Sequence, residues 1–224
     1  MPNEVRWGIL GTAKIARTFS KAIGDCTGTR VQAVASREHT RALEWAKEQG
    51  IPRVFGSYEE MLKSTEIDCV YNPLPNSLHA EWTIKALEAG LPVLCEKPFT
   101  SNAAEARRVA EVARQRHLPV AEAFMYRYHP LYDRILNLVQ DGALGELIAM
   151  RSVFSFRMRD RNNIIADASL AGGALMDVGC YCVNLSRLVA GVEPARVCAF
   201  ERRSTVDDAM AAVMEFPSGL LAQF

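Results

Sequence analysis

The sequence has 224 residues, of which 49% are hydrophobic and 23% are charged. This balance is that of an ordinary globular protein, so it excludes a disordered chain and provides material for one large domain or two small ones. Lys and Arg together number 26, as do Asp and Glu, and this zero net charge argues against a nucleic-acid partner.

No apolar run reaches the roughly 18 residues that a membrane span needs, and no signal peptide is recognisable. We therefore expect a cytoplasmic protein with no membrane partner. The six cysteines form no CxxC pair and the four histidines form no HxxxH pair. These spacings predict reduced structural thiols and no metal site.

The first half of the chain alternates short apolar runs with helical segments. The alternation indicates six strands with five helices between them, and the strands that can be located are 5–10, 31–35, 68–71, 93–95 and 120–123. Helices are expected at 14–23, 40–49, 58–62, 77–89 and 102–116, with Ser57, Asn76 or Ser77, and Asn102 as N-caps. This order is typical of right-handed βαβ units, and it predicts a Rossmann domain with a doubly wound parallel sheet over residues 1–123.

The second half, residues 124–224, has a different pattern. Helices are expected at 130–140 and 174–190, and strands at 147–156, 197–200, 209–216 and 220–224. This pattern predicts an α+β domain with a mostly antiparallel sheet. Because the last strand ends inside a hairpin, we expect this domain to be truncated at its C-terminal end.

The first functional signal is the turn after the first strand, within Gly8-Ile9-Leu10-Gly11-Thr12-Ala13-Lys14-Ile15-Ala16. A dinucleotide-binding turn needs a glycine, then a small residue facing the pyrophosphate, then a small residue where helix and strand pack. Gly11, Ala13 and Ala16 fill these places. Because glycines are common at strand-to-helix turns, the motif is weak without its βαβ context.

Cofactor choice depends on the end of the second strand, 20 residues beyond Ala16. An acidic side chain there binds the ribose of NAD, whereas a basic one suits the 2′-phosphate of NADP. Ser36 and Arg37 occupy this position. The pair favours NADP, with NAD still possible, and the alternative is that Arg37 is a solvated loop residue.

Two further segments carry reactive side chains. Lys97 follows the strand at 93–95, at the sheet edge where open α/β sheets bind ligands, although it is equally compatible with a loop lysine paired with Glu96. Asp177 and Tyr181 are four residues apart and share a helix face beside Gly172 and Gly173. A tyrosine whose pKa is lowered by a cation such as Lys97 transfers protons, but the spacing alone also fits a structural tyrosine and a capping aspartate.

Five segments together resemble the Gfo/Idh/MocA oxidoreductase family over essentially the whole chain. They are WGILGTAKIA, YNPLPNSLHAEW, the EKP of Glu96–Pro98, EAFMYRYHP and GGALMDVGCYCV. The branch that they resemble most contains dimeric dihydrodiol dehydrogenases and NADP-dependent D-xylose dehydrogenases. The resemblance implies hydride transfer between the nicotinamide of NAD(P) and a sugar, cyclic alcohol or diol.

The resemblance also implies roles for individual residues. Tyr181 is expected as the general acid/base, with Lys97 beside the nicotinamide and Asp177 orienting Tyr181 or the substrate. The dinucleotide contacts that it implies are Gly11, Thr12, Ala13, Ile15, Ser36, Arg37, Leu74, Asn76, His79, Glu96 and Arg127. Met125 and Phe154 are expected, with Asp177, at the substrate.

Two departures from the family pattern limit what the resemblance implies. Met125 stands where that branch usually has a tryptophan, so specificity for an aromatic diol is not expected to carry over. The second domain is shorter than the family's, whose last strands usually supply the dimer face, so a homo-oligomer is expected of the full-length protein. The alternative function is a non-catalytic dinucleotide-binding regulator with the same fold.

Overall fold

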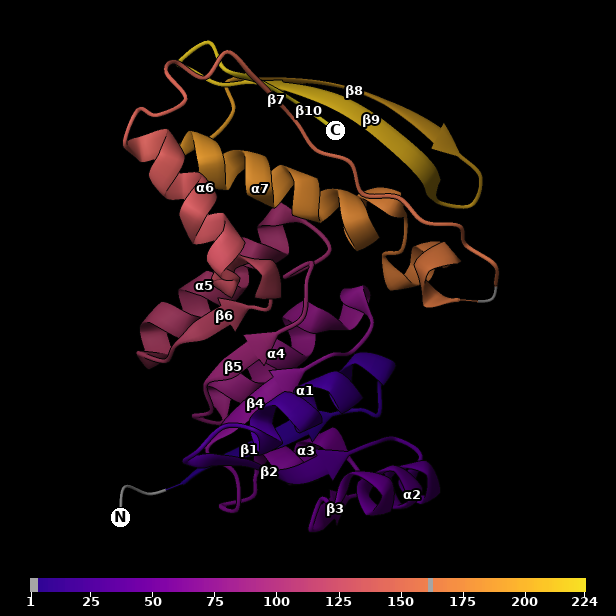
Figure 1. The fold of residues 1–224 in the computed structure, drawn as a ribbon. Helices are drawn as coiled ribbons and strands as arrows, with labels where there is room; N and C mark the ends of the chain where they lie inside the picture. Colours follow the sequence, from indigo (N-terminus) through magenta and orange to yellow (C-terminus); the bar gives the residue numbers. More distant parts are fainter. Residues whose placement is uncertain (1–3, 161–162) are drawn as a thin grey trace. The chain divides into compact units, whose positions relative to one another are not determined.

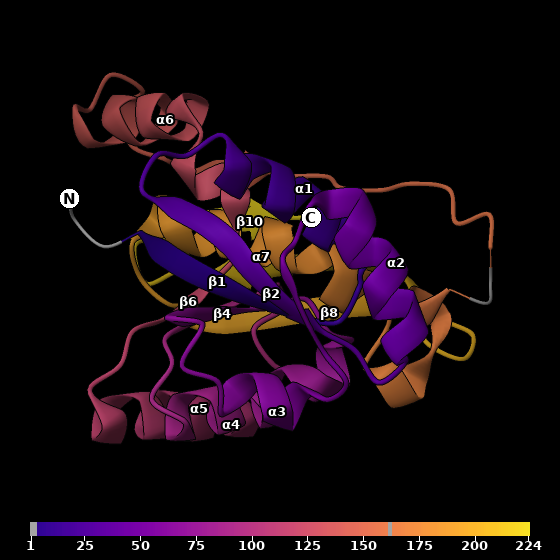
Figure 2. The same ribbon diagram turned by 90° about the horizontal axis from the view of Figure 1, so that it is seen from below.

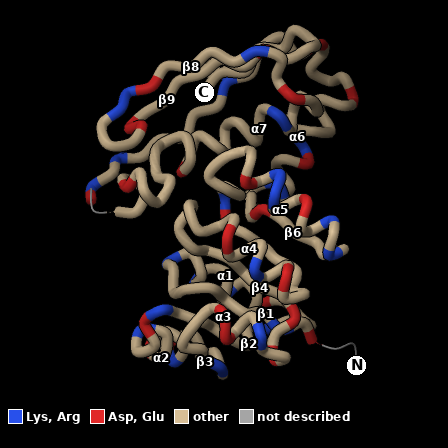
Figure 3. The backbone as a smooth tube through the Cα atoms, turned by 180° about the vertical axis from the view of Figure 1, so that it is seen from behind, with Lys and Arg blue, Asp and Glu red and all other residues tan. Residues whose placement is uncertain are grey.

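The computed structural model describes residues 4–160 and 163–224, and it divides into two compact units, Met1–Ala123 and Phe124–Phe224. Each unit has a sheet of its own (Figure 1). Basic and acidic residues are interspersed along both units (Figure 3).

The first unit is a Rossmann-type domain, as predicted. Its six strands are all parallel and lie in the order β3-β2-β1-β4-β5-β6. The strands are β1 Val5–Leu10, β2 Thr29–Ala35, β3 Arg53–Phe55, β4 Cys69–Asn72, β5 Val93–Cys95 and β6 Val120–Glu122. The short strand β3, which sequence could not locate, extends the sheet at the β2 edge.

Five α-helices connect the strands of this sheet and cover both of its faces. They are α1 Lys14–Gly24, α2 His39–Gln49, α3 Tyr58–Leu62, α4 His79–Glu88 and α5 Ala103–Arg116. Helices α1 and α2 lie on one face and α3, α4 and α5 on the other (Figure 2). Both faces are therefore apolar, as in doubly wound folds, where strands read as continuous hydrophobic runs.

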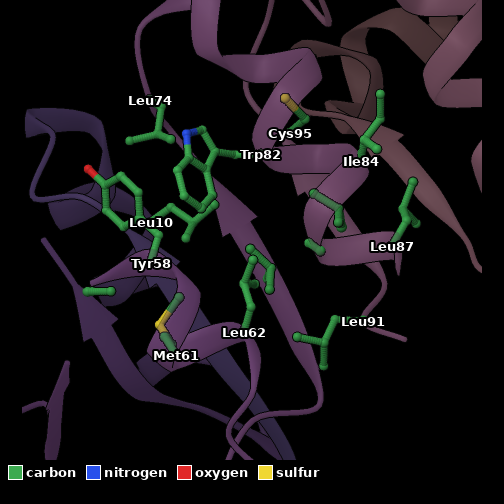
Figure 4. Close-up of a cluster of buried hydrophobic side chains, with 14 of the residues drawn as sticks. Leu10, Tyr58, Met61, Leu62, Leu74, Trp82, Ile84, Leu87, Leu91 and Cys95 are labelled. Carbon is green, nitrogen blue, oxygen red and sulfur yellow. The ribbon is translucent and has the colours of Figure 1, made fainter. Parts of the chain in front are cut away.

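The two faces of β1 supply two separate cores. Ile9 points to the α1 and α2 side, where it packs with Ala16 and Trp45, and Leu10 points to the opposite side. Ile9 and Leu10 are both fully buried. Figure 4 shows the second core, in which Leu10 of β1 lies close to Tyr58 of α3 and Trp82 of α4. Each such side chain contributes roughly 1.5–3 kcal/mol of transfer free energy.

The predicted N-caps of α3 and α5 are confirmed, whereas that of α4 is wrong. The side chains of Ser57 and Asn102 accept hydrogen bonds from the backbone three residues on. Helix α4 begins at His79 after a 3₁₀ turn over Asn76–Leu78, in which Leu78 N donates to Pro75 O at 2.8 Å. In this turn the N–H groups of Leu78 and His79 bind backbone carbonyls in place of a side-chain cap.

The cap of α5 yields a measurable prediction. Asn102 Oδ1 accepts from Glu105 N at 3.0 Å, and the Glu105 carboxylate accepts from Ser101 N at 3.0 Å. We expect Asn102→Ala to lower the free energy of unfolding by about 1 kcal/mol, measured by urea denaturation. Gln115→Ala, on the exposed surface of the same helix, is the control and should change it by less than about 0.5 kcal/mol. Equal effects of the two substitutions would show that the cap contributes nothing.

The second unit contains a four-stranded sheet in the order β7-β10-β9-β8. The strands are β7 Ala149–Arg151, β8 Arg196–Arg203, β9 Asp207–Glu215 and β10 Leu221–Gln223. Strands β8, β9 and β10 are antiparallel, as predicted, but β7 pairs with β10 in parallel. The sheet is therefore mixed and mostly antiparallel.

The strand expected at 147–156 is largely wrong. Only Ala149–Arg151 forms a strand, and its three residues pair in parallel with Leu221–Gln223 of β10. The ladder ends where Ser152 N donates to Gln223 O at 2.9 Å, and residues 152–160 continue outside any strand.

Two helices belong to the second unit, α6 Pro130–Gln140 and α7 Cys180–Ala190. The helix expected at 174–190 is present: residue 174 is helical, a π turn over Leu175–Gly179 follows it, and α7 continues directly to Ala190. Residues Ala168–Ala190 together are long and apolar enough for a membrane span by length and composition, a test that core helices also pass. Ala171 with φ 56° and Gly173 with φ 116° interrupt the helix in this stretch.

Candidate functional site

The turn between β1 and α1 has the geometry of a phosphate-binding turn. Gly11 has φ +82°, and its N–H donates to Ala35 O at 2.7 Å. A Cβ at this position would lie 3.1 Å from Leu74 Cδ2 and 3.5 Å from the Tyr58 hydroxyl. Glycine is thus required both by the left-handed backbone and by the narrow space.

The helix that follows this turn leaves its N-terminal N–H groups available to an anion. Ala13 is the N-cap residue and provides no side-chain acceptor, and the first turn contains no acidic residue. Thr12 is partly exposed and Ile15 is exposed, whereas Ala16 is fully buried against the sheet. With no side-chain cap in the way, the positive end of the helix dipole favours a phosphate here, so these residues fit a dinucleotide.

The end of β2 places a cation close to this turn. Ser36 is buried and its hydroxyl accepts from Glu38 N at 3.2 Å, whereas Arg37 is exposed. Burial raises the pKa of the Tyr58 hydroxyl. The Arg37 guanidinium acts on the same hydroxyl, and its positive charge opposes that rise. Tyr58 therefore lies next to both Gly11 and Arg37, a contact between distant segments that sequence reasoning missed.

Lys97 lies on the turn after β5, at the carboxyl edge of the parallel sheet. The neighbouring Glu96 does not project freely, because its carboxylate accepts from the Tyr71 hydroxyl at 2.6 Å and from Lys97 N at 3.2 Å. The turn is thereby tied to β4 through Tyr71. In the loop after β4, Leu74 is buried and Asn76 is partly exposed.

His79 occupies the first position of α4, immediately behind these loops. It is only 1% exposed, and its Nδ1 and Nε2 lie 2.7 Å from Pro98 O and 2.7 Å from Leu74 O. Burial lowers the pKa of His79, while the two carbonyl contacts and the Glu96 charge oppose that shift. Both ring nitrogens are thus engaged by the backbone.

Tyr181 lies on α7 within a cluster of aromatic rings in the second unit. Its ring centroid is 5.2 Å from that of Phe124, 6.0 Å from Tyr126 and 5.4 Å from Phe154. Its hydroxyl is 3.7 Å from the sulfur of Met125, which is 66% exposed. The ring is held on several sides, so the position of the hydroxyl is well defined by packing.

Tyr126 and Asn184 fix this aromatic cluster, and sequence reasoning identified neither of them. Tyr126 donates a hydrogen bond from its hydroxyl to Asn184 Oδ1, one turn along α7 from Tyr181. Arg127, in the same 3₁₀ turn over Met125–Tyr128, is exposed and borders a polar groove with Asn184 and Glu193. A YxY spacing in EAFMYRYHP was the only signal for Tyr126.

Asp177 lies in the π turn one helical turn before Tyr181. It borders a cavity of about 210 Å³ with Phe154, Val178 and Asp207 among its other walls. The lining is predominantly apolar, and it includes the carboxylates of Asp177, Asp207 and Asp208. Such a lining is typical of small-molecule sites, where a few polar groups orient a mostly buried ligand.

The glycines at 172 and 173 serve packing within the chain. A Cβ on Gly173 would lie 1.9 Å from Asp207 Oδ1, and one on Gly172 would lie 2.3 Å from Ile165 O. Asp207 Oδ2 in turn accepts from Leu175 N at 2.6 Å. Asp207, from a strand distant in sequence, therefore caps the start of this helix.

The cysteines and acidic residues form no metal centre in the described part of the chain. All six cysteines are free thiols. Burial raises the pKa of Cys69 to about 12 and that of Cys95 to about 12, so both remain protonated and inert near neutral pH.

Comparison with known proteins identifies the family. Residues 5–124 match the oxidoreductase family with the NAD-binding Rossmann fold, and residues 132–224 match the Gfo/Idh/MocA C-terminal domain. The chain belongs to the Gfo/Idh/MocA family. The resemblance inferred from the five sequence segments is confirmed.

Named relatives of this Gfo/Idh/MocA protein act on sugars and diols. It is 43% identical to D-xylose 1-dehydrogenase (NADP(+)) 2 of Haloferax volcanii, over 97% of this chain and 67% of the relative. It is 33% identical to trans-1,2-dihydrobenzene-1,2-diol dehydrogenase of Bos taurus, over 98% of this chain and 67% of the relative. The chain thus spans about two thirds of the length of these relatives.

The structure comparison gives the same family. A 3-ketoreductase from Actinomadura kijaniata, solved with NADP and TDP-benzene, superposes with a TM-score of 0.92 at 32% identity. The match covers 99% of this chain and 69% of the ketoreductase. The fold of this Gfo/Idh/MocA chain is therefore that of a dinucleotide-dependent reductase.

Proposed function

We propose that this protein is an NADP-dependent oxidoreductase that acts on a CH–OH group, or the corresponding carbonyl, of a sugar or cyclic alcohol or diol. Tyr181 is the general acid/base, Lys97 assists it, and Asp177 orients the substrate. The proposal includes a homo-oligomeric full-length protein in the cytoplasm.

The observation that carries the proposal is the position of Lys97 on an ordered turn at the carboxyl edge of the Rossmann sheet. Ligands of open α/β sheets bind outside this edge, where the Gly11 turn also lies. Solved structures of the Actinomadura kijaniata ketoreductase include a tyrosine-to-phenylalanine and a lysine-to-alanine variant. Those variants direct attention to the same two residue types in that enzyme.

The dinucleotide, when bound, donates or accepts the hydride. Thr12, Ala13 and Ile15, at the start of α1, would hold the pyrophosphate, and Ser36 with Arg37 would hold the 2′-phosphate. Leu74, Asn76 and Glu96 come from the two loops at the same sheet edge, and we assign them, with Arg127, to the nicotinamide half. We do not assign His79 to the dinucleotide, as the resemblance implied, because both of its ring nitrogens contact backbone carbonyls.

The protein's own residues manage the proton. In the reductive direction, the Tyr181 hydroxyl gives its proton to the carbonyl oxygen that becomes the alcohol, and in the oxidative direction the phenolate takes it back. The Lys97 ammonium favours the phenolate by its positive charge. The Asp177 carboxylate accepts hydrogen bonds from substrate hydroxyl groups, while Phe154 and Met125 pack against the carbon skeleton.

The cofactor preference gives the first test. We expect a fluorescence titration to show tighter binding of NADPH than of NADH, and Arg37→Gln to raise the Kd for NADPH by roughly 10- to 150-fold. That range corresponds to one charge-assisted hydrogen bond of about 1.5–3 kcal/mol. Binding of NADH should change little, because NADH has no 2′-phosphate.

Arg30→Gln is the matched control, since Arg30 lies at the opposite end of the same strand and pairs with Glu4. It should leave both affinities unchanged. Preference for NADH would overturn the NADP assignment. Tight NADPH binding with no turnover across a panel of sugars and diols would favour the non-catalytic regulator instead.

A further inference from the structure

Two loops that meet at the proposed active site are joined by one buried side chain. The loop after β4 contains Leu74, and the turn after β5 contains Lys97 and Pro98. The ring of His79 lies between them, with Nε2 2.7 Å from Leu74 O and Nδ1 2.7 Å from Pro98 O. At 1% exposure the ring leaves no room for water to replace either contact.

The chemistry of these contacts makes the ring a donor on the side of Pro98, Leu74 or both. A carbonyl oxygen only accepts hydrogen bonds, whereas a neutral imidazole has one N–H and an imidazolium has two. The charged groups that act on the ring are Glu96, which favours the imidazolium, and Lys97, which opposes it. An unsatisfied buried carbonyl costs about 1–3 kcal/mol, so the backbone to which the ring donates is held in place by it.

The backbone of His79 is itself held by the buried side-chain amide of Asn72. Asn72 is fully buried, and its Nδ2 donates to His79 O at 3.2 Å and to Thr83 Oγ1 at 3.1 Å. Asn72 O accepts from Glu96 N at 3.0 Å. The start of α4, the end of β4 and the residue before Lys97 are thus one hydrogen-bonded unit in which the His79 ring spans the remaining gap.

We propose that His79 is a positioning residue for Lys97: by binding Pro98 O through Nδ1 it fixes the turn that carries the lysine. This inference rests on the proposed function only for its effect on turnover. The link itself, from α4 to the turn at Pro98, is a property of the free protein and can be measured without substrate or cofactor.

Two substitutions separate the ring nitrogens. The amide nitrogen of Asn occupies roughly the place of Nδ1 and that of Gln roughly the place of Nε2, so His79→Asn keeps a donor toward Pro98 and His79→Gln keeps one toward Leu74. Val109→Ala, in the same core but on α5, is the control for lost stability alone.

Amide hydrogen exchange, followed by mass spectrometry, tests the link in the free protein. We expect peptides covering residues 96–100 to exchange at least about tenfold faster in His79→Gln than in wild type, and His79→Asn to restore most of the protection. Val109→Ala should not accelerate exchange selectively in this segment. Unchanged exchange in His79→Gln, or equal acceleration in the control, would overturn the proposal.

Turnover tests the consequence for Lys97. We expect His79→Gln to lower kcat by about tenfold with little change in the Kd for NADPH, and His79→Asn to recover most of that loss. In a Lys97→Met background, the His79→Gln substitution should cause no additional loss, because its effect passes through the lysine. If His79→Gln lowers kcat by the same factor in the Lys97→Met background as in wild type, the positioning role is overturned. Absence of turnover in wild type would instead refute the proposed function and leave the exchange experiment to decide the link.

Discussion

Tyr181→Phe is expected to lower kcat by about 10²- to 10⁴-fold, the usual contribution of a positioned general acid or base. The substitution removes only the hydroxyl group. The phenyl ring keeps its contacts with Phe124 at 5.2 Å and with Phe154 at 5.4 Å, so the packing of α7 is preserved. The Kd for NADPH should change by less than about threefold, because the hydroxyl acts on the proton and not on the dinucleotide.

Tyr126→Phe provides the matched control in the same aromatic cluster. Its hydroxyl donates to Asn184 Oδ1, and its ring centroid is 6.0 Å from that of Tyr181. We expect this variant to lose about 1 kcal/mol of unfolding free energy with only a small change in kcat. The measurement is steady-state kinetics with the best substrate from the sugar and diol panel. Near-normal kcat in Tyr181→Phe, or equal losses in the two variants, would remove Tyr181 from the chemistry.

Most of the Rossmann half of the fold was predictable because its elements are marked locally, although the three-residue strand β3 carries no such mark. The first strand ends just before Gly11 and helix α2 ends at Gly50. Helices α3 and α5 each open on a side-chain cap that accepts from the N–H of a glutamate three residues on. In the second unit, the length of β7 was not predictable. Its three residues pair with β10, about 70 residues away, and nothing within the apolar run at 147–156 marks where that pairing ends.

The same distinction applies to the site. The Gly11 turn, Arg37, Lys97 and Tyr181 each stand in a recognisable motif. The residues that hold them lie far away in sequence: Tyr58 beside Arg37, Tyr71 on Glu96 and Asn184 on Tyr126. No short spacing encodes such contacts, because they arise only when distant strands and helices pack. Local patterns thus identified the candidate reactive groups, whereas only the fold identified the groups that contact them.

Gly173 shows how strongly one such long-range contact constrains a single position. Its φ of +116° is unfavourable for any residue with a side chain, and a Cβ would fall 1.9 Å from Asp207 Oδ1. That carboxylate cannot simply move away, since its other oxygen accepts from Leu175 N at 2.6 Å. Gly173 also accepts from Asp177 N at 2.9 Å through its own carbonyl, so the start of the helix that carries Tyr181 depends on this residue twice.

We therefore expect Gly173→Ala to lower the free energy of unfolding by about 3 kcal/mol, from roughly 1–2 kcal/mol of backbone strain and about 1 kcal/mol for the displaced cap. Gly191→Ala separates the two causes. Gly191 has φ +69° but no atom within 4 Å of a built Cβ, so it should show the strain alone, about 1 kcal/mol. Urea denaturation of both variants measures the difference.

If Gly173→Ala is no more destabilising than Gly191→Ala, then the Asp207 side chain moves aside at little cost and the cap it provides does not hold the Tyr181 helix. If the larger loss is found together with a reduced kcat at temperatures where the protein remains folded, then the contact between β9 and the π turn also positions the tyrosine.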